Sequence, residues 1–296
     1  MADRQWRALH VYRWHGQDEL LLDTIAPELA RLGVSRFFYL RYWRGGPHLR
    51  LRVPPESFEA LRAAVAAHLA RHPAVPRQDG PGALAAQREL ARLEGADPAP
   101  LMPQDTVREE PYEPEYAKYG GPEGVRIAED LFHSSSLIAL DAVRSFRSNP
   151  RGRIVTALDM LLAPLAAVGM HGDEAVAFLA GYHRFWSPYA PDQSSWPEHH
   201  ATSEQAVAQV VRRTPVGPLA RRWADAVAAA WARLGPDSLA AVQAPTDQDR
   251  RRLLLLNYLH THNNRMGVTP AHEAYLAYLA YLAHRAHTAR SAGKIA

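Results

Sequence analysis

One stretch of the sequence concentrates side chains that can hold anions. Residues 36–53, RFFYLRYWRGGPHLRLRV, alternate in type on either side of a Gly-Gly-Pro turn, which predicts a β-hairpin. If the first strand is registered with Arg41 opposite His48, one face is basic. That face then carries Tyr39, Arg41, His48, Arg50 and Arg52. Guanidinium groups offer fixed paired donors, which suit a carboxylate, a phosphate or a peptide carbonyl, although a merely solvated strand face would also carry charge.

A second stretch carries side chains that can move protons. Residues 253–265, LLLLNYLHTHNNR, predict an apolar helix that abruptly becomes polar. At about 100° per residue, Asn257, His260 and Asn264 fall on one face of this helix. A histidine titrates near neutral pH and is therefore a candidate acid or base. Hydrogen bonding inside the core would explain the same pattern, and the helix alone does not decide between the two interpretations.

The third candidate is the segment 112–121, YEPEYAKYGG, which ends in a glycine pair. Glu115 and Lys118 are three residues apart, so a local surface ion pair explains them as readily as chemistry does. Tyr119 adds a phenol directly before the glycines.

The elements that must position these groups indicate an α+β protein. A strand at 7–14, a helix at 17–32, the hairpin and a helix at 56–71 predict an N-terminal lobe, residues 1–121, built on a mixed sheet with helices. Residues 122–296 predict a larger, mainly helical half of the same domain. Within it, the proline-rich segment 186–201 predicts a mobile loop or lid.

The composition of the chain bears on its location, on nucleic-acid binding and on metal sites. The 296 residues are 47% hydrophobic and 22% charged, which is typical of a soluble globular protein. The sequence shows no signal peptide and no membrane span, so we expect a cytoplasmic location. A net charge of +3 with dispersed arginines does not indicate nucleic-acid binding. The absence of cysteine excludes disulfides and thiolate metal sites, and the 15 histidines form no recognisable zinc spacing.

Four motifs in order resemble the lantibiotic dehydratase C-terminal, or thiopeptide-type bacteriocin biosynthesis, family. They are FFYLRYWRGGPHLRLR, YEPEYAKYGG, AEDLFHSSS and HTHNNRMG, and they span essentially the whole chain. Members act on ribosomally made peptides, either by eliminating glutamate in tRNA-dependent dehydratases or as stand-alone pyridine synthases that fuse two dehydroalanines. The chain departs from the eliminating members at Pro114 and Lys118, where they carry Arg, and in its WRGGP turn. Lys cannot grip a carboxylate with two donors, which disfavours glutamate elimination.

The resemblance implies a stand-alone pyridine synthase that needs no metal or redox cofactor. It implies a leader-bearing precursor peptide with dehydroalanines as the substrate. We also expect no nucleic-acid or membrane partner, and a monomer that could work beside other enzymes of its pathway. By position, it implies catalytic roles for His260 and Glu115, and we expect Tyr119 as a further candidate for proton transfer. Substrate binding is then expected of Arg41, His48, Arg50, Arg52, Lys118, Asn257, Asn264 and Arg265. The alternatives are a glutamate-eliminating subunit and a non-catalytic subunit that presents the precursor peptide.

Overall fold

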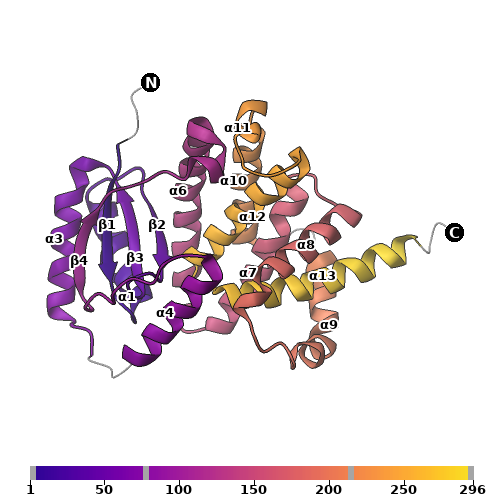
Figure 1. Ribbon diagram of the computed structural model, residues 1–296, viewed down its shortest axis with the longest axis horizontal. Coiled ribbons are helices and arrows are strands. Elements are labelled where there is room, and N and C mark those ends of the chain that lie inside the picture. Colours follow the sequence, from indigo (N-terminus) through magenta and orange to yellow (C-terminus); the bar gives the residue numbers. More distant parts are fainter. Residues whose placement is uncertain (1–4, 76–79, 213–216, 293–296) are drawn as a thin grey trace. The chain divides into compact units, whose positions relative to one another are not determined.

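The computed structural model describes residues 5–75, 80–212 and 217–292 (Figure 1). The chain divides into two compact units, Met1–Pro114 and Glu115–Ala296, a few residues before the boundary at 121 expected from the sequence. The first unit contains a four-stranded sheet with helices, and helices make up the second. The α+β class and the helical C-terminal half are therefore confirmed.

The sheet of the first unit has the strand order β2-β3-β1-β4. Its strands are β1 (Arg7–Tyr12), β2 (Phe38–Tyr42), β3 (His48–Val53) and β4 (Thr106–Glu110). Every pairing is antiparallel, so the expectation of a mixed sheet was wrong. The helical connection after β1 does make β1 and β2 parallel in direction, but β3 lies between them, so the two are not hydrogen-bonded neighbours.

The hairpin forms, but its register differs by one residue from the prediction. Tyr42 pairs with His48, and Arg41 pairs with Leu49. Because side chains alternate along a strand, this shift moves all of β2 to the opposite face. Phe38, Leu40 and Tyr42 therefore share a face with Arg50 and Arg52, whereas Tyr39 and Arg41 lie on the other side of the sheet.

The apolar face of the sheet packs against helices of the same unit. These helices are α1 (Gln17–Leu20), the π-helical turn η1 (Leu21–Ile25), α2 (Ala26–Arg31) and α3 (Pro55–Arg71), and Leu9, Val11, Leu49 and Leu51 beneath them are fully buried. Arg7 lies on this face, with its guanidinium 3.7 Å from the ring of Phe58 in α3. Arg41 also lies on this face and pairs with Asp18 at 2.6 Å.

The hairpin loop is held by α4 (Gly80–Glu94). The side-chain amide of Gln87 accepts from the Gly45 backbone N–H and donates to the Ala99 carbonyl. Gly45 and Gly46 have φ of 80° and 100°, a conformation that favours glycine and lets the loop turn back within five residues. The loop therefore fixes where β3 begins, and with it which side chains of β3 lie on the same face as His48.

The opposite face of the sheet buries two histidines, His10 and His48, which are 7% and 0% exposed. Burial, with a further contribution from the Arg50 and Arg52 charges, lowers the pKa of His10 to about 2. Burial likewise lowers the pKa of His48 to about 4. Both imidazoles are therefore neutral at pH 7.

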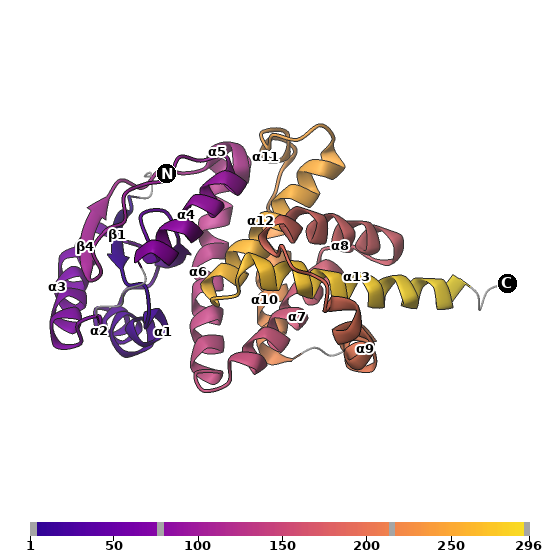
Figure 2. The same ribbon diagram turned by 60° about the horizontal axis from the view of Figure 1, so that its bottom comes forward.

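The second unit is a packed set of helices. They are α5 (Tyr116–Tyr119), α6 (Gly121–Ser145), α7 (Pro150–Ala167), α8 (Gly172–Trp186), the 3-10 turn η2 (Ser187–Tyr189), α9 (Trp196–Arg212), α10 (Pro218–Ala232), α11 (Pro236–Ala240), α12 (Asp247–Arg265) and α13 (Pro270–Ala292). The last helix, α13, runs beside α7 and α8 (Figures 1 and 2). None of the described helices has the length and apolar character that a membrane crossing requires.

The segment 186–201 is more ordered than the expected loop. It contains η2, and α9 begins within it at Trp196, whose side chain is 8% exposed. Trp196 packs edge-on against Tyr275 of α13 at 5.3 Å. Burial of this large aromatic ring stabilises the segment between η2 and α9, which its prolines alone would not hold in one conformation.

The glycine pair at 120–121 links α5 to α6. Gly120 has a φ of 89°, and a Cβ atom there would overlap the carbonyl oxygen of Ser238 in α11. Only glycine fits such a position, because both the backbone conformation and the close approach exclude a side chain.

Replacing Gly120 with alanine is expected to lower the free energy of unfolding by more than about 2 kcal/mol, since strain and a backbone clash add. Urea denaturation followed by circular dichroism measures the change. Gly169→Ala is the matched control, because Gly169 has a similar φ of 78° but open space around it. The control is expected to cost only about 1 kcal/mol, and equal losses in the two variants would contradict the steric account.

The buried His10 makes stability depend on pH. Its folded pKa lies below its unfolded value, so the unfolded chain takes up the proton first, and stability is lost as pH falls below about 6.5. Between pH 7.5 and 5.5 this one group accounts for a loss of about 1.4 kcal/mol. His10→Gln is expected to shrink the measured loss by that amount. The exposed His15 supplies the control variant His15→Gln, and a similar shrinkage there would contradict the assignment.

Candidate functional site

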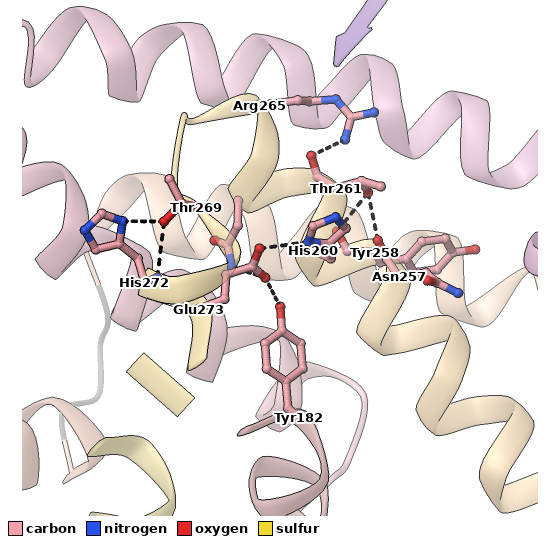
Figure 3. Close-up of polar contacts among 10 residues, drawn as sticks. Tyr182, Asn257, Tyr258, His260, Thr261, Arg265, Thr269, His272 and Glu273 are labelled. Atoms are coloured by element: carbon pink, nitrogen blue, oxygen red, sulfur yellow. Dashed lines mark hydrogen bonds and ion pairs between the residues drawn. The ribbon is translucent and has the colours of Figure 1, made fainter. Parts of the chain in front are cut away.

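The polar centre of the second unit is the buried carboxylate of Glu273, near the start of α13. Its side chain has no exposed surface. His260 Nδ1 lies 2.8 Å from Oε1, while the Tyr182 hydroxyl and, at 3.2 Å, the Asn263 amide donate to Oε2. Figure 3 shows the carboxylate between His260 and Tyr182. Donors from α8 and α12 thus offset the cost of burying the carboxylate.

A tight corner between α12 and α13 brings His260 and Glu273 together. Gly267, with a φ of 75°, ends α12, and the backbone N–H groups of Gly267 and Val268 bond to the carbonyls of Asn264 and Asn263. This is the Schellman pattern of helix termination. Thr269 then caps α13 by accepting from the His272 N–H, with Pro270 at the first helical position.

The imidazole of His260 is held on two sides. Its ring stacks on the indole of Trp186 with 4.2 Å between centroids and 26° between planes. A carboxylate only accepts hydrogen bonds, so Nδ1 carries the proton and Nε2 is left to exchange one. The side chain remains 22% exposed. His260 can therefore act as a proton donor or acceptor in a fixed orientation.

Tyr182 supports the same carboxylate from α8. Burial and the neighbouring Glu273 charge raise the pKa of Tyr182 well above its ordinary value. The phenol therefore keeps its proton and donates a hydrogen bond to Glu273. Tyr182 and Trp186 are one helical turn apart, so a single face of α8 contacts both members of the His260–Glu273 pair.

The basic face of the first unit consists of His48, Arg50 and Arg52 on β3. Arg50 Nε donates to His48 Nε2 at 3.1 Å, and the guanidinium lies 3.4 Å from the ring of Tyr42. His48 can accept this bond because it is neutral and its Nδ1 donates to the Gly46 carbonyl at 2.8 Å. Arg52 is 7% exposed, and one of its nitrogens donates to the Arg50 carbonyl at 3.0 Å. The structure thus brings these three predicted residues together.

Two residues predicted to bind substrate, Arg41 and Arg265, make contacts within the fold instead. Arg41 lies on the opposite face of the sheet and pairs with Asp18. Arg265 is fully buried, donates to Ser135 Oγ at 3.2 Å and to the Thr261 carbonyl at 2.9 Å, and lies 4.6 Å from the Phe132 ring. Arg265 therefore ties α12 to α6.

Asn257 and Asn264 share the helix face of His260, as α12 spans all three. Asn257 is 7% exposed, and Asn264 is partly exposed. The neighbouring His262 points elsewhere. It stacks on Trp223 at 4.0 Å and bonds to Ser135 Oγ at 2.8 Å, and burial lowers its pKa well below the ordinary value.

The YEPEYAKYGG residues lie around the short helix α5. Glu115 and Lys118 form an ion pair at 3.3 Å on the surface. Tyr119 is 3% exposed and packs against Phe132 at 5.1 Å. Burial raises the pKa of Tyr119, so this phenol is protonated and enclosed by the core of its unit.

Sequence reasoning missed Glu273 and Tyr182. The available signal for Glu273 was a single acid at the first turn of an otherwise apolar and aromatic helix, HEAYLAYLAYLAH. For Tyr182 no sequence signal separated it from ordinary aromatic core residues. Across the residues that the structure describes, no group of three or more His, Asp or Glu side chains is arranged as metal ligands.

Comparisons with known proteins give a consistent picture. Among solved structures, the chain is similar to the pyridine synthase TbtD from thiomuracin biosynthesis, with 24% sequence identity, a TM-score of 0.76, and 96% of this chain and 99% of that chain covered. It is also similar to TsrL, at 21% identity and a TM-score of 0.68, with 94% of each chain covered.

A third similar structure is the tRNA-dependent lantibiotic dehydratase MibB from Microbispora sp. 107891, at 19% identity and a TM-score of 0.57. The match covers 98% of this chain but 29% of that one, so this chain spans less than a third of MibB. No curated protein matches the chain in sequence.

The family model described as lantibiotic biosynthesis dehydratase C-term matches residues 6–284. Because this match covers nearly the whole chain, the protein belongs to the lantibiotic biosynthesis dehydratase C-terminal family.

Proposed function

We propose that this protein is a tailoring enzyme for a ribosomally synthesised peptide, and that it forms a pyridine-type macrocycle from two dehydroalanines. The proposal is supported by family membership and by the shared fold with a pyridine synthase along the full length of both chains. The observation that carries it is the His260–Glu273 pair, a partly exposed imidazole held by a buried carboxylate.

The proposed reaction is a formal aza-[4+2] cycloaddition. One dehydroalanine, with the preceding amide in its imidic acid form, supplies four ring atoms, and the second supplies the alkene. The adduct then loses its hydroxyl group with a ring proton as water, and the leader departs as a carboxamide, which leaves the aromatic ring. Holding the two ends of one peptide together can contribute several kcal/mol to lowering the barrier, on the order of that measured for intramolecular reactions.

His260 serves the elimination steps in this proposal. Its Nε2 delivers a proton to the departing hydroxyl or amide nitrogen and takes one from the ring. Glu273 acts as a positioning residue, since it fixes the imidazole orientation and stabilises the protonated form. Trp186 excludes water from one face of the ring.

The basic residues bind the peptide in this proposal. Arg50 and Arg52 hold carbonyl or leader carboxylate groups, and His48 positions Arg50 through the Nε–Nε2 hydrogen bond. Lys118, Asn257 and Asn264 remain proposed substrate contacts. Glu115 and Tyr119 receive no proton-transfer role here, because Glu115 is paired on the surface with Lys118 and Tyr119 is buried with its proton.

Glutamate elimination is the second candidate, and the two neighbouring arginines on β3 favour it. In that case Arg50 and Arg52 would hold the glutamyl carboxylates and His260 would act as the base. The lysine at position 118, paired with Glu115, offers no bidentate grip and weighs against it.

The products distinguish these reactions. Purified protein mixed with a dehydrated, leader-bearing precursor is expected to yield a macrocycle and a released leader carboxamide, both detectable by mass spectrometry. A parallel sample with a glutamylated precursor is expected to stay unchanged. Free glutamate with a new dehydroalanine would instead support elimination, and no conversion of either peptide would leave only a peptide-binding role.

His260→Ala is expected to lower the rate of macrocycle formation by about 10² to 10⁴ fold, the usual contribution of a positioned acid or base. Glu273→Gln is expected to lower the rate as well and to change its pH profile, because the neutral amide lacks the negative charge that stabilises a protonated imidazole. Single-turnover kinetics measure both effects. Thermal unfolding temperatures equal to that of the unmodified protein show that the variants are folded. The exposed His171 gives the control His171→Ala, and a comparable loss there, or full activity in His260→Ala, would overturn the assignment.

A further inference from the structure

A cavity of about 410 Å³ lies in the second unit, next to the start of α13. It is bounded by η2, by the beginning of α9 and by the first turns of α13. The side chains that matter for its chemistry are Tyr189, Asp192, Trp196, His199, His272 and Tyr275. Neither the proposed mechanism nor the sequence motifs use this cavity.

Three aromatic side chains from three different segments line it. The rings of Trp196 and Tyr275 meet edge-on, with 5.3 Å between centroids and 61° between planes. Tyr189 adds a third ring from η2. Aromatic faces at an angle to one another attract a cation through their negative faces, and an arginine side chain can also stack on them.

The charge of the lining matches a cation. Among the described residues that line the cavity, Asp192 contributes the one carboxylate, and none is a lysine or arginine. Hydrogen bonds from the Ser194 hydroxyl and N–H, at 2.7 and 3.0 Å, lower the pKa of Asp192 and keep it ionised. His272 adds no positive charge at neutral pH, since burial lowers its pKa.

The cavity adjoins the residues proposed for catalysis. Trp186, which stacks on His260, also contacts the ring of Tyr189 at 5.3 Å. His272, which lines the cavity, directly precedes Glu273 and bonds through Nδ1 to the Thr269 hydroxyl at 2.8 Å (Figure 3). The rings of Tyr189 and Trp186 would therefore lie between a group bound in the cavity and the His260 imidazole.

We infer that this cavity binds the cationic side chain of an arginine or lysine residue of the substrate peptide. The inference rests on the proposed function for the nature of the substrate as a peptide. The anchored cation would set which residues of the peptide reach His260. The site would thus act as a specificity determinant beside the reacting centre.

Small probes test the site without any turnover. N-acetylarginine amide, its neutral isostere N-acetylcitrulline amide and N-acetylphenylalanine amide are titrated into the full chain, with binding followed by ligand-observed NMR. The arginine probe is expected to bind at least about fivefold more tightly than the citrulline probe, the factor expected from a cation between aromatic rings. Asp192→Asn is expected to lower this preference, because the carboxylate adds to the attraction of the rings, while Asp225→Asn, at an exposed acid on α10, preserves it.

Equal binding of the arginine and citrulline probes would overturn the inference. So would tighter binding of the phenylalanine probe that is insensitive to Asp192→Asn, which would make the cavity an aromatic pocket. Because this experiment requires no reaction, its failure leaves the macrocycle assay unaffected. Conversely, cation binding in a chain that forms no macrocycle would contradict the proposed function alone.

Discussion

Burial of the Glu273 carboxylate is the constraint around which the second unit is arranged. A carboxylate without exposed surface is costly unless donors surround it. The donors come from α8 and α12, so these helices must meet α13 at one point. The glycine-terminated end of α12 and the threonine cap of α13 make that meeting compatible with the backbone. One buried charge thereby fixes the orientation of a partly exposed histidine.

On the basic face of the first unit, a buried polar group also orients a functional side chain, but here the buried group is neutral. His48 is buried and neutral, so it accepts from Arg50 without adding a second positive charge beside it. The Gly-Gly loop fixes the first residue of β3, and the strand period then places Arg50 and Arg52 on the same face as His48. Buried polar groups thus orient side chains in each unit, and in the first unit the buried neutral histidines lower stability when pH falls.

The sequence was sufficient for the α+β class, the hairpin and the helix that carries His260, because each rests on a strong local period. It could not set the register of β2. In FFYLRY both alternating sets contain aromatic residues, so hydrophobicity does not choose a face, and the choice depends on Asp18 pairing with Arg41 and on the α4 contacts to the loop. The roles of Arg265 and Tyr119 were equally inaccessible, because burial depends on tertiary packing. A sequence motif does not show whether its residues lie in the core or in a functional site.

The central claim is that the Glu273 carboxylate holds His260 as the Nδ1–H tautomer, with Nε2 left to exchange protons. Long-range ¹H–¹⁵N NMR spectra of imidazole-labelled protein report the tautomer directly, with His260 assigned by the signal lost in His260→Ala. At a pH where the imidazole is neutral, the account predicts a protonated Nδ1 and an unprotonated Nε2 for His260, and a loss of that preference in Glu273→Gln. A His260 signal from the Nε2–H tautomer, or a tautomer mixture unchanged by Glu273→Gln, would contradict it.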